Sequence, residues 1–361
     1  MPASEESRVA KWSEQEVLDR IESVRRRAPK IRDEAINMAH GAGGKATHTL
    51  VDALFRPAFN NPSGDQALFQ LGGQSLAVTT DSYVVSPIFF PGGDIGDLAI
   101  NGTVNDLVVG GAEPVAITAG FIIEEGLSIE ELRRVVESMA RSAAAVGVPL
   151  LAGDTKVVPR GKGDRVFINT TGVGVVREPE RLGTGRVVAG DVVLVSGTVG
   201  DHGTAIMLAR GDLDIEANLD SDTAPLNTLC RSMLDAGDVH LMRDATRGGV
   251  ATVLNELAQE AGLAVAIREE RIPVRDEVRG AAEILGIDPL YMANEGKLVA
   301  IVAAADADAV LAAMRAQPLG SEAATIGEIR SEPPGMVFMH TAFGGSRVVD
   351  MLIGDPLPRI C

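Results

Sequence analysis

Apolar runs of strand length alternate with helical patterns from about residue 50 onward, and this alternation constrains the fold most strongly. Short runs rich in Val, Ile and Leu predict strands, whereas apolar residues at helical spacing predict helices. The expected strands cover 75–80, 115–123, 148–152, 166–176, 192–196, 239–242 and 297–303, with β-like runs over 336–353. Helices are expected at 128–147, from 249 through Ala261, and at 306–317. Such alternation predicts an α/β protein.

The length of 361 residues favours two domains. We expect a charged extension over 1–36 and a first domain over 37–176. A second domain is expected over 187–353, and a mobile tail over 354–361. Within the extension, Val17, Ile21 and Val24 have helical spacing and predict an amphipathic helix, which we interpret as a solvated element.

The tail ends in Cys361, preceded by Pro356 and Pro358. Prolines fix φ and keep the preceding residue extended, so we expect a stiff arm without regular structure. The seven residues after Gly354 span at most about 25 Å, enough to leave the body and re-enter a pocket. A frayed terminus that happens to end in cysteine is the simpler alternative.

A net charge of −17 argues against nucleic acid or an anionic membrane as a partner. The two cysteines, Cys230 and Cys361, form no metal-binding pair, and Cys230 is expected to be buried. Two reduced thiols indicate a cytoplasmic protein. The longest apolar run is too short to span a bilayer.

Aspartates recur where strands are predicted to end. Asp81, Asp154 and Asp244 follow such ends, while Asp65 and Asp106 are expected in loops, the latter within the Gly/Asp/Asn-rich stretch 93–111. Sites assemble at strand ends in α/β sheets, and Mg²⁺ takes one or two carboxylates together with phosphate oxygens. Each aspartate alone would be a turn residue, but the set of five favours a metal–phosphate site.

The remaining motifs complete a specific pattern. They are His40–Gly44, Thr79-Thr80-Asp81-Ser82, Asn105-Asp106, Gly153-Asp154-Thr155-Lys156, Gly197–Gly203, Arg243–Gly249, Asn294-Glu295-Gly296 and the ending Pro358-Arg359-Ile360-Cys361. In this order, from about residue 37 to the end, the chain resembles the HypE family of hydrogenase maturation proteins, which are carbamoyl dehydratases. Ala245 stands where that family has a proline.

The resemblance implies an aminoimidazole ribonucleotide synthetase-like fold, an α/β protein of the α+β type with two mixed-sheet domains and a flexible tail. It implies a homodimer formed through the first domain, with ATP and Mg²⁺ bound near the interface. A carbamoyltransferase of the HypF type would load the terminal thiol. The chain would then use ATP to dehydrate the carbamoyl group to a thiocyanate, and pass cyanide to an iron scaffold of the HypC–HypD type for [NiFe] hydrogenase.

Residue roles follow from the resemblance. Cys361 would carry the carbamoyl group, Lys156 would assist phosphate or proton transfer, and Glu295 would remove the N–H proton. Mg²⁺ would be held by Asp65, Asp81, Asp106, Asp154 and Asp244. These five and Gly43, Gly44, Asn105, Gly153, Thr155, Asp201, Arg247 and Gly248 would bind the nucleotide. His202 would orient neighbouring groups or be a structural histidine.

Two alternatives remain at this point. A related ATP-dependent small-molecule kinase or synthetase would share the aspartates but would not need a terminal thiol. A non-catalytic scaffold would present the C-terminal peptide to a partner groove.

Overall fold

The computed structural model describes residues 30–59, 64–176, 182–212, 217–354, 357 and 359–361. The amphipathic helix predicted for the extension falls on residues outside these ranges. The described start of the chain leads into short helical turns: η1 (Met38–Gly41), α2 (Lys45–Leu50), η2 (Val51–Phe55) and α3 (Arg56–Phe59). Asn37 caps the first turn by accepting a hydrogen bond from Ala39 N.

The first sheet has five strands in the order β1-β2-β7-β5-β6. Their bounds are β1 (Ala67–Leu71), β2 (Gln74–Tyr83), β7 (Val166–Val176), β5 (Ala112–Glu124) and β6 (Leu150–Val158). All neighbours are antiparallel except β5 and β6, so the sheet is mixed as predicted. Along β7, buried residues alternate with more exposed ones, because one face packs on helices and the other does not. A small ribbon, β3 (Phe89–Phe90) with β4 (Gly93–Asp94), contacts the helices α4 (Ile95–Val109) and α6 (Asp201–Arg210).

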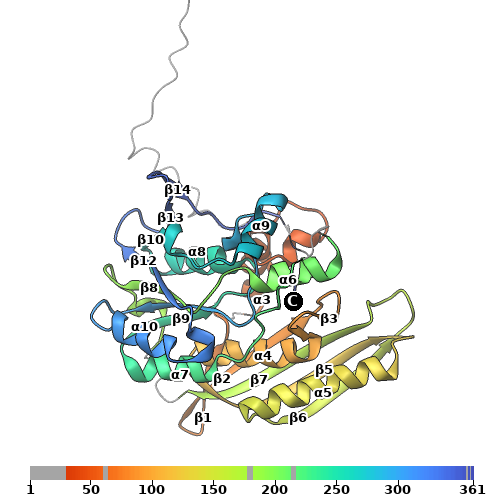
Figure 1. Ribbon diagram of the computed structural model, residues 1–361. Helices are drawn as coiled ribbons and strands as arrows, with labels where there is room; N and C mark the ends of the chain where they lie inside the picture. Colours follow the sequence, from red (N-terminus) through yellow and green to blue (C-terminus); the bar gives the residue numbers. More distant parts are fainter. Residues whose placement is uncertain (1–29, 60–63, 177–181, 213–216, 355–356, 358) are drawn as a thin grey trace, which may run out of the picture.

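The helix α4 (Ile95–Val109) lies between the first sheet and the second domain (Figure 1). The prediction of a loop over 93–111 was wrong at this point, and Asp106 lies on a helix. Asp94 caps the helix by accepting from Gly96 N and Asp97 N. The helix is buried nearly all round, so it lacks the apolar stripe that reveals an amphipathic helix. Its glycine at 102 lies directly against the Tyr83 hydroxyl, which leaves no space for a side chain.

The helix α5 (Ile129–Val146) matches the prediction closely. Ser128 accepts from Glu131 N at the beginning, and Gly147 ends the helix with φ 72°. Val135 and Met139 are buried on its apolar face. Here the pattern was readable because one face is solvated and the other packs beside α4.

Two strands differ from their prediction. The strand expected at 148–152 begins at Leu150 and continues to Val158, so Asp154 lies in the middle of β6 rather than after it. β6 is an edge strand and is almost entirely exposed, not buried. Asp81 likewise lies inside β2, two residues before its end. Asp244 is the last residue of β9, as expected for a strand end.

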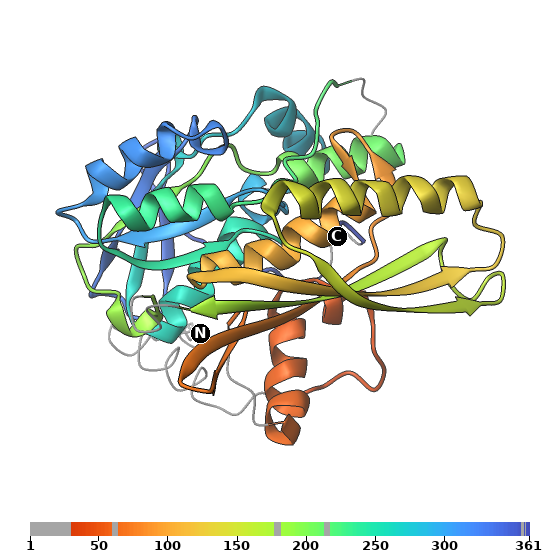
Figure 2. The ribbon, with the colours of Figure 1, turned by 90° about the horizontal axis from the view of Figure 1, so that it is seen from below.

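The second sheet has seven strands in the order β14-β13-β10-β12-β8-β11-β9. Their bounds are β8 (Val192–Val195), β9 (Val239–Asp244), β10 (Ala264–Arg268), β11 (Leu298–Val302), β12 (Ala324–Arg330), β13 (Val337–His340) and β14 (Ser346–Val348). The helices are α6 (Asp201–Arg210), α7 (Asn227–Ala236), α8 (Gly249–Ala261), α9 (Asp276–Leu285) and α10 (Ala307–Arg315). The strand β11, between β8 and β9, is buried along its whole length, with helices on both sides of the sheet (Figures 1 and 2).

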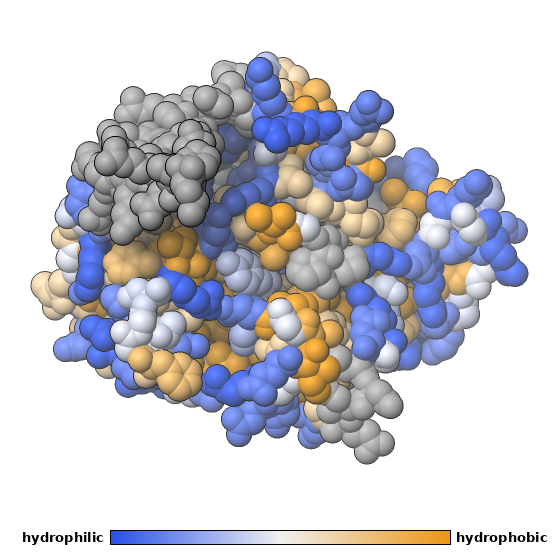
Figure 3. All heavy atoms as spheres, turned by 90° about the horizontal axis from the view of Figure 1, so that it is seen from above, coloured by the Kyte–Doolittle hydropathy of each residue, from blue (hydrophilic) through white to orange (hydrophobic). Residues whose placement is uncertain are grey.

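The outer surface is strongly polar. Seen from above, hydrophilic side chains dominate the described surface and apolar ones gather in separate patches (Figure 3). No helix in the described ranges has the length and apolar content needed to span a membrane. Both cysteines are free, and Cys230 is buried in the core as predicted.

Candidate active site

Four of the five predicted aspartates meet between the two domains. Asp65 precedes β1, Asp81 lies on β2, Asp106 on α4, and Asp244 at the end of β9. Thr79 joins two of them, because its hydroxyl lies 2.6 Å from Asp106 Oδ2 and 2.8 Å from the Asp65 carbonyl oxygen. The close approach of α4 to β2 and β9 therefore builds a carboxylate cluster from four separate elements.

The pKa values of this cluster are raised. Burial is the main cause for Asp106 and Asp244, and each also feels the negative charge of its neighbours. The pKa of Asp65 rises to about 6, again mainly through burial, although the Arg243 guanidinium opposes the shift. Asp81 is the most exposed of the four, and the surrounding protein still excludes enough water to raise its pKa. Such a concentration of uncompensated carboxylates is typical of a functional site.

Mg²⁺ fits this cluster. Across the described ranges, no three His, Cys, Asp or Glu side chains converge as ready-made ligands of one metal ion. Mg²⁺ needs fewer, because it usually takes one or two carboxylates and completes its shell with phosphate and water oxygens. Four carboxylates with raised pKa values are a suitable donor set for divalent charge that arrives with a nucleotide.

Two arginines border the cluster. Arg243 on β9 is buried and lies 3.7 Å from Asp65, with Glu256 and Glu260 at 3.2 and 3.0 Å. Arg247 follows β9 and donates to the Gly41 carbonyl at 2.8 Å. Its other nitrogen, Nη2, lies 2.8 Å from Cys361 Sγ. The nucleotide contact that the resemblance implies for Arg247 stays a prediction, and the structure adds a contact between its guanidinium and the terminal thiol.

The end of the tail is docked inside the protein. Ile360 is 2% exposed, and the last residues run alongside residues 84–86. Val84 N donates to the Cys361 carbonyl at 3.1 Å, and Ser86 N donates to the Arg359 carbonyl at 3.2 Å. Arg359 itself has φ 57°, a conformation that residues with a side chain seldom adopt.

The docked thiol is a weak nucleophile. Burial raises the pKa of Cys361 to about 12, and the negative charges of Glu295 and Asp81 act in the same direction. Arg247 opposes the shift through its charge and its contact with Sγ. A thiol in this position is protonated at neutral pH, and the thiolate is the nucleophilic form.

Glu295 is buried next to this thiol. Its pKa is raised well above the ordinary value, first by burial and then by the charges of Asp81, Asp244 and Asp222. Among the described residues, no donor reaches its Oε1 atom. Its backbone is held firmly, since Glu295 N donates to Asp222 Oδ1 at 2.9 Å and its carbonyl accepts from Asn105 at 3.1 Å. The carboxyl is thus desolvated, and its Oε1 has no hydrogen bond from the described residues.

Lys156 and Asp154 lie away from the carboxylate cluster of their own chain. On β6 they bind each other, with Lys156 Nζ 2.6 and 2.8 Å from the Asp154 oxygens. Across the sheet, Asp154 on β6 pairs with Gly120 on β5. Gly120 pairs with Asn169 on β7, which in turn pairs with Ser82 on β2. Three strand spacings separate the ends of that row, roughly 14 Å. The side chains of 154 and 156 also project to the open face, opposite to Asp81, because alternate residues point to opposite faces.

Of the other residues predicted to bind the nucleotide, some are closely packed and others lie on the exposed strand β6. Gly43 N donates to Thr47 Oγ1 at 3.0 Å, and a Cβ at Gly43 would press on the Arg247 carbonyl. Gly44 packs on Leu352 just as closely, and Gly248 has φ 80° at the beginning of α8. Asn105 bridges the domains by donating to Ala224 O and accepting from Leu226 N. Gly153 and Thr155 are on exposed β6 with Asp154.

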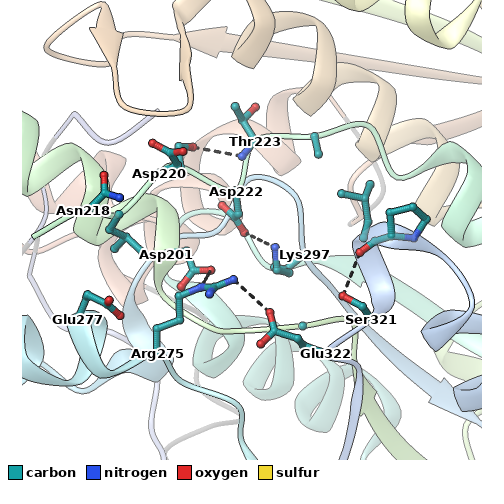
Figure 4. A pocket seen from close by; sticks show the side chains of 16 residues that line it. Asp201, Asn218, Asp220, Asp222, Thr223, Arg275, Glu277, Lys297, Ser321 and Glu322 are labelled. Atoms are coloured by element: carbon teal, nitrogen blue, oxygen red, sulfur yellow. Dashed lines mark hydrogen bonds and ion pairs between the residues drawn. The ribbon is translucent and has the colours of Figure 1, made fainter.

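Asp201 lies in a different pocket, shown in Figure 4. This cavity of about 510 Å³ is bounded by residues 218–224 and by charged side chains of four other segments. Asp201 accepts from Arg275 at 3.1 Å, and Lys297 pairs with Asp222 at 3.2 Å (Figure 4). Because Asp222 also binds Glu295 N, the segment 218–224 connects this pocket to the active site.

Several site residues were not found from the sequence. Asp222 holds the backbone of Glu295, Arg210 donates to the Arg359 carbonyl of the docked arm, and Ser221 contacts His202, which bonds the arm. The stretch around 217–226 has no periodic pattern and consists largely of turn-forming residues, so it gave no signal beyond a loop.

Comparison with known proteins agrees with this geometry. The model of AIR synthase related protein, N-terminal domain, matches residues 63–176, and that of the C-terminal domain matches residues 188–339. Carbamoyl dehydratase HypE of Rhodobacter capsulatus is 51% identical over 338 residues, which is 92% of this chain and 99% of the relative. HypE of Escherichia coli K12 is 47% identical, over 90% of this chain and 99% of the relative. The chain belongs to the HypE family of carbamoyl dehydratases.

Solved structures of HypE proteins have the same architecture. A HypE–HypF complex gives a TM-score of 0.79 at 45% identity, covering 84% of this chain and 99% of that one. HypE in complex with ATP gives 0.77 at 46% identity, covering 91% and 100%. Thiamine monophosphate kinase of Aquifex aeolicus shares the fold alone, with a TM-score of 0.61 at 18% identity. The predicted membership of the HypE family and the predicted fold are therefore confirmed.

Proposed function

We propose that this chain dehydrates a carbamoyl group on its own Cys361 to a thiocyanate, at the expense of ATP, and so supplies cyanide for the iron of [NiFe] hydrogenase. The observation that carries the proposal is the position of Cys361. Its Sγ lies 2.8 Å from Arg247, close enough to Glu295 and Asp81 for their charges to raise its pKa. A carried group attached to this sulfur would face the acidic cluster.

The reaction divides into two transfers. The carbamoyl oxygen attacks the γ-phosphorus of ATP, the bond from that phosphorus to the bridging oxygen breaks, and ADP leaves. Phosphorylation of the oxygen is accompanied by loss of one of the two N–H protons, which leaves a C=N–H group. Loss of the second N–H proton then lets the C–O bond break, with release of phosphate and formation of S–C≡N. Phosphoryl transfer depends mainly on positioning and charge neutralisation. Asp65, Asp81, Asp106 and Asp244 would hold Mg²⁺, whose charge would offset that of the phosphates.

Glu295 is the proposed base for the N–H proton. Its raised pKa makes the carboxylate a stronger base than a solvated glutamate, and its free Oε1 has room for a proton. Arg247 counteracts the shift and favours the ionised form. Asp222 and Asn105 fix the backbone of Glu295, so the carboxyl stays next to the docked arm.

Loading of the thiol requires the arm to leave. A docked thiol with a pKa of about 12 is a poor nucleophile, and it is partly buried against Arg247. A carbamoyltransferase of the HypF type, the partner in the relative's crystal complex, would therefore act on the released arm. Dehydration requires the docked arm, because water would hydrolyse the phosphorylated intermediate. After release, an iron scaffold of the HypC–HypD type would take the cyano group, in the cytoplasm.

A homodimer would complete the site. β6 is an exposed edge strand, and Leu151 and Val157 on it are 69% and 67% exposed. Ile122 on the neighbouring β5 is 47% exposed, so this sheet presents apolar residues to solvent. Lys156 lies on the same strand and projects away from its own chain's cluster. We therefore assign Lys156 and Asp154 to the active site of the partner subunit.

Subunit mixing tests this assignment. Lys156→Ala and Glu295→Gln chains, each inactive alone, are unfolded together, refolded and assayed. If Lys156 acts on the partner's site, mixed dimers contain one intact site and recover activity. Absence of recovery in mixtures that do form mixed dimers would place Lys156 in its own chain's site.

Intact-mass analysis tests the overall function. In a first step the chain is loaded by a HypF-type transferase with its carbamoyl donor, and it is then freed of donor and nucleotide. Without ATP in the second step, Cys361 should retain the carbamoyl mass, and addition of Mg-ATP should remove one water. The related small-molecule kinase and the peptide scaffold predict no modification of Cys361, and the docked position of the thiol gives neither of them support.

A further inference from the structure

His202 is a fully buried side chain that the proposed chemistry does not use. It is the second residue of α6, and its ring is enclosed between the body and the docked arm. Phe90 packs against it edge to face, with ring centres 5.7 Å apart. A buried histidine needs partners for both ring nitrogens, and the identity of those partners indicates its role.

The two partners come from opposite sides. Nδ1 lies 2.7 Å from Ser221 Oγ, and Nε2 lies 2.9 Å from the carbonyl oxygen of Ile360. A carbonyl only accepts, so Nε2 carries the proton. Burial lowers the pKa of His202, and in the neutral ring Nδ1 then accepts from the Ser221 hydroxyl. Ser221 in turn is anchored, since its N–H donates to Pro91 O at 2.8 Å.

The Ile360 carbonyl belongs to the peptide bond that leads directly to Cys361. Within the described residues, His202 alone bonds this carbonyl. The carbonyls on either side have backbone partners of their own, Ser86 N for Arg359 and Val84 N for Cys361. Ile360 is 2% exposed, so its carbonyl would be buried and unpaired without His202. In a released arm, water would satisfy it. The bond therefore favours the docked arm over the released one.

We propose that His202, held by Ser221, is a positioning residue that docks the carrier arm and sets the orientation of Cys361 at the active site. The proposal rests on the proposed role of the arm as substrate carrier. It does not depend on the phosphorylation chemistry. His202 touches neither the thiol nor the cluster in its assigned contacts, and it acts through the last peptide bond.

The test measures arm release without ATP or partner, so it is separate from the test of the reaction itself. In the Cys230→Ala background, the alkylation rate of Cys361 reports the released fraction. His202→Leu should raise this rate by about 5- to 100-fold, the range expected when one buried carbonyl loses its partner. His202→Gln, which retains a donor at a similar reach, should restore much of the protection, and Ser221→Ala should give an intermediate rate.

A matched control separates arm docking from general loosening. In the Cys361→Ala background, the buried Cys230 reports opening of the body, and its alkylation should be unchanged by His202→Leu. Carbamoylation by the transferase should be undiminished in His202→Leu, whereas single-turnover dehydration should slow. An unchanged Cys361 rate, or an equal rise at Cys230 and Cys361, would overturn the proposal.

Discussion

Replacement of Asp65 by asparagine should stabilise the protein at neutral pH. Folding raises the pKa of Asp65 from 3.8 to about 6, mainly through burial, and this carboxyl is 27% exposed. A raised pKa means that the folded state favours the protonated form. The stabilising contribution of the protonated Asp65 carboxyl is therefore fully present below about pH 4, and it is lost as the pH rises through about 6. A shift of this size corresponds to up to about 3 kcal/mol at pH 8.

Urea unfolding at 25 °C measures this effect. Asp65→Asn should gain up to about 3 kcal/mol over wild type at pH 8 and almost nothing at pH 4. Arg243 keeps Glu256 and Glu260 as partners, so the substitution leaves no unpaired guanidinium. Asp235→Asn, at an exposed position on α7, is the matched control and should change neither value. Mg-ATP should stabilise Asp65→Asn less than wild type. A variant that is less stable than wild type at pH 8 would refute the reasoning.

Three further predictions concern the arm and the base. Cys361→Ala should abolish the cyano product and retain ATP binding, while Cys230→Ala should be nearly silent in both; a reversed pattern would exchange their roles. Glu295→Gln should bind ATP normally and lose about 10²- to 10⁴-fold in dehydration, with carbamoylated chain accumulating by mass, and wild-type turnover would exclude it as the base. Mg-ATP should slow the alkylation of Cys361 in the Cys230→Ala background, because a nucleotide that contacts the docked arm favours docking. An unchanged alkylation rate would mean that ATP does not gate the arm.

The regular elements with one solvated face were predictable from sequence. β7 matches its predicted bounds, and α5 has both its predicted cap and its terminal glycine. The helix α4 was missed because burial on all sides removes the periodic signal, and its Gly, Asn and Asp residues resemble a loop. Those polar residues are there because the helix contributes Asp106 and Asn105 to the contact between domains.

The sequence predicted which aspartates form the carboxylate cluster better than it predicted the elements on which they lie. Asp65, Asp81, Asp106 and Asp244 converge, although Asp81 lies inside a strand rather than after its end, and Asp106 lies on a helix rather than in a loop. Asp154 was grouped with them because it follows an apolar run, but no sequence pattern shows which face of an edge strand a residue takes relative to a distant site. The docking of the arm on His202 and Arg247 depends on contacts across more than a hundred residues, which periodicity does not reveal.

The fate of the carbamoyl oxygen tests the central claim most directly. The chain is loaded at Cys361 with a carbamoyl group labelled with oxygen-18, freed of donor, and given Mg-ATP in unlabelled water for a single turnover. If ATP phosphorylates the carbamoyl oxygen before it leaves, the released inorganic phosphate carries the label while Cys361 gains the thiocyanate. Label in water, with unlabelled phosphate, would contradict the account.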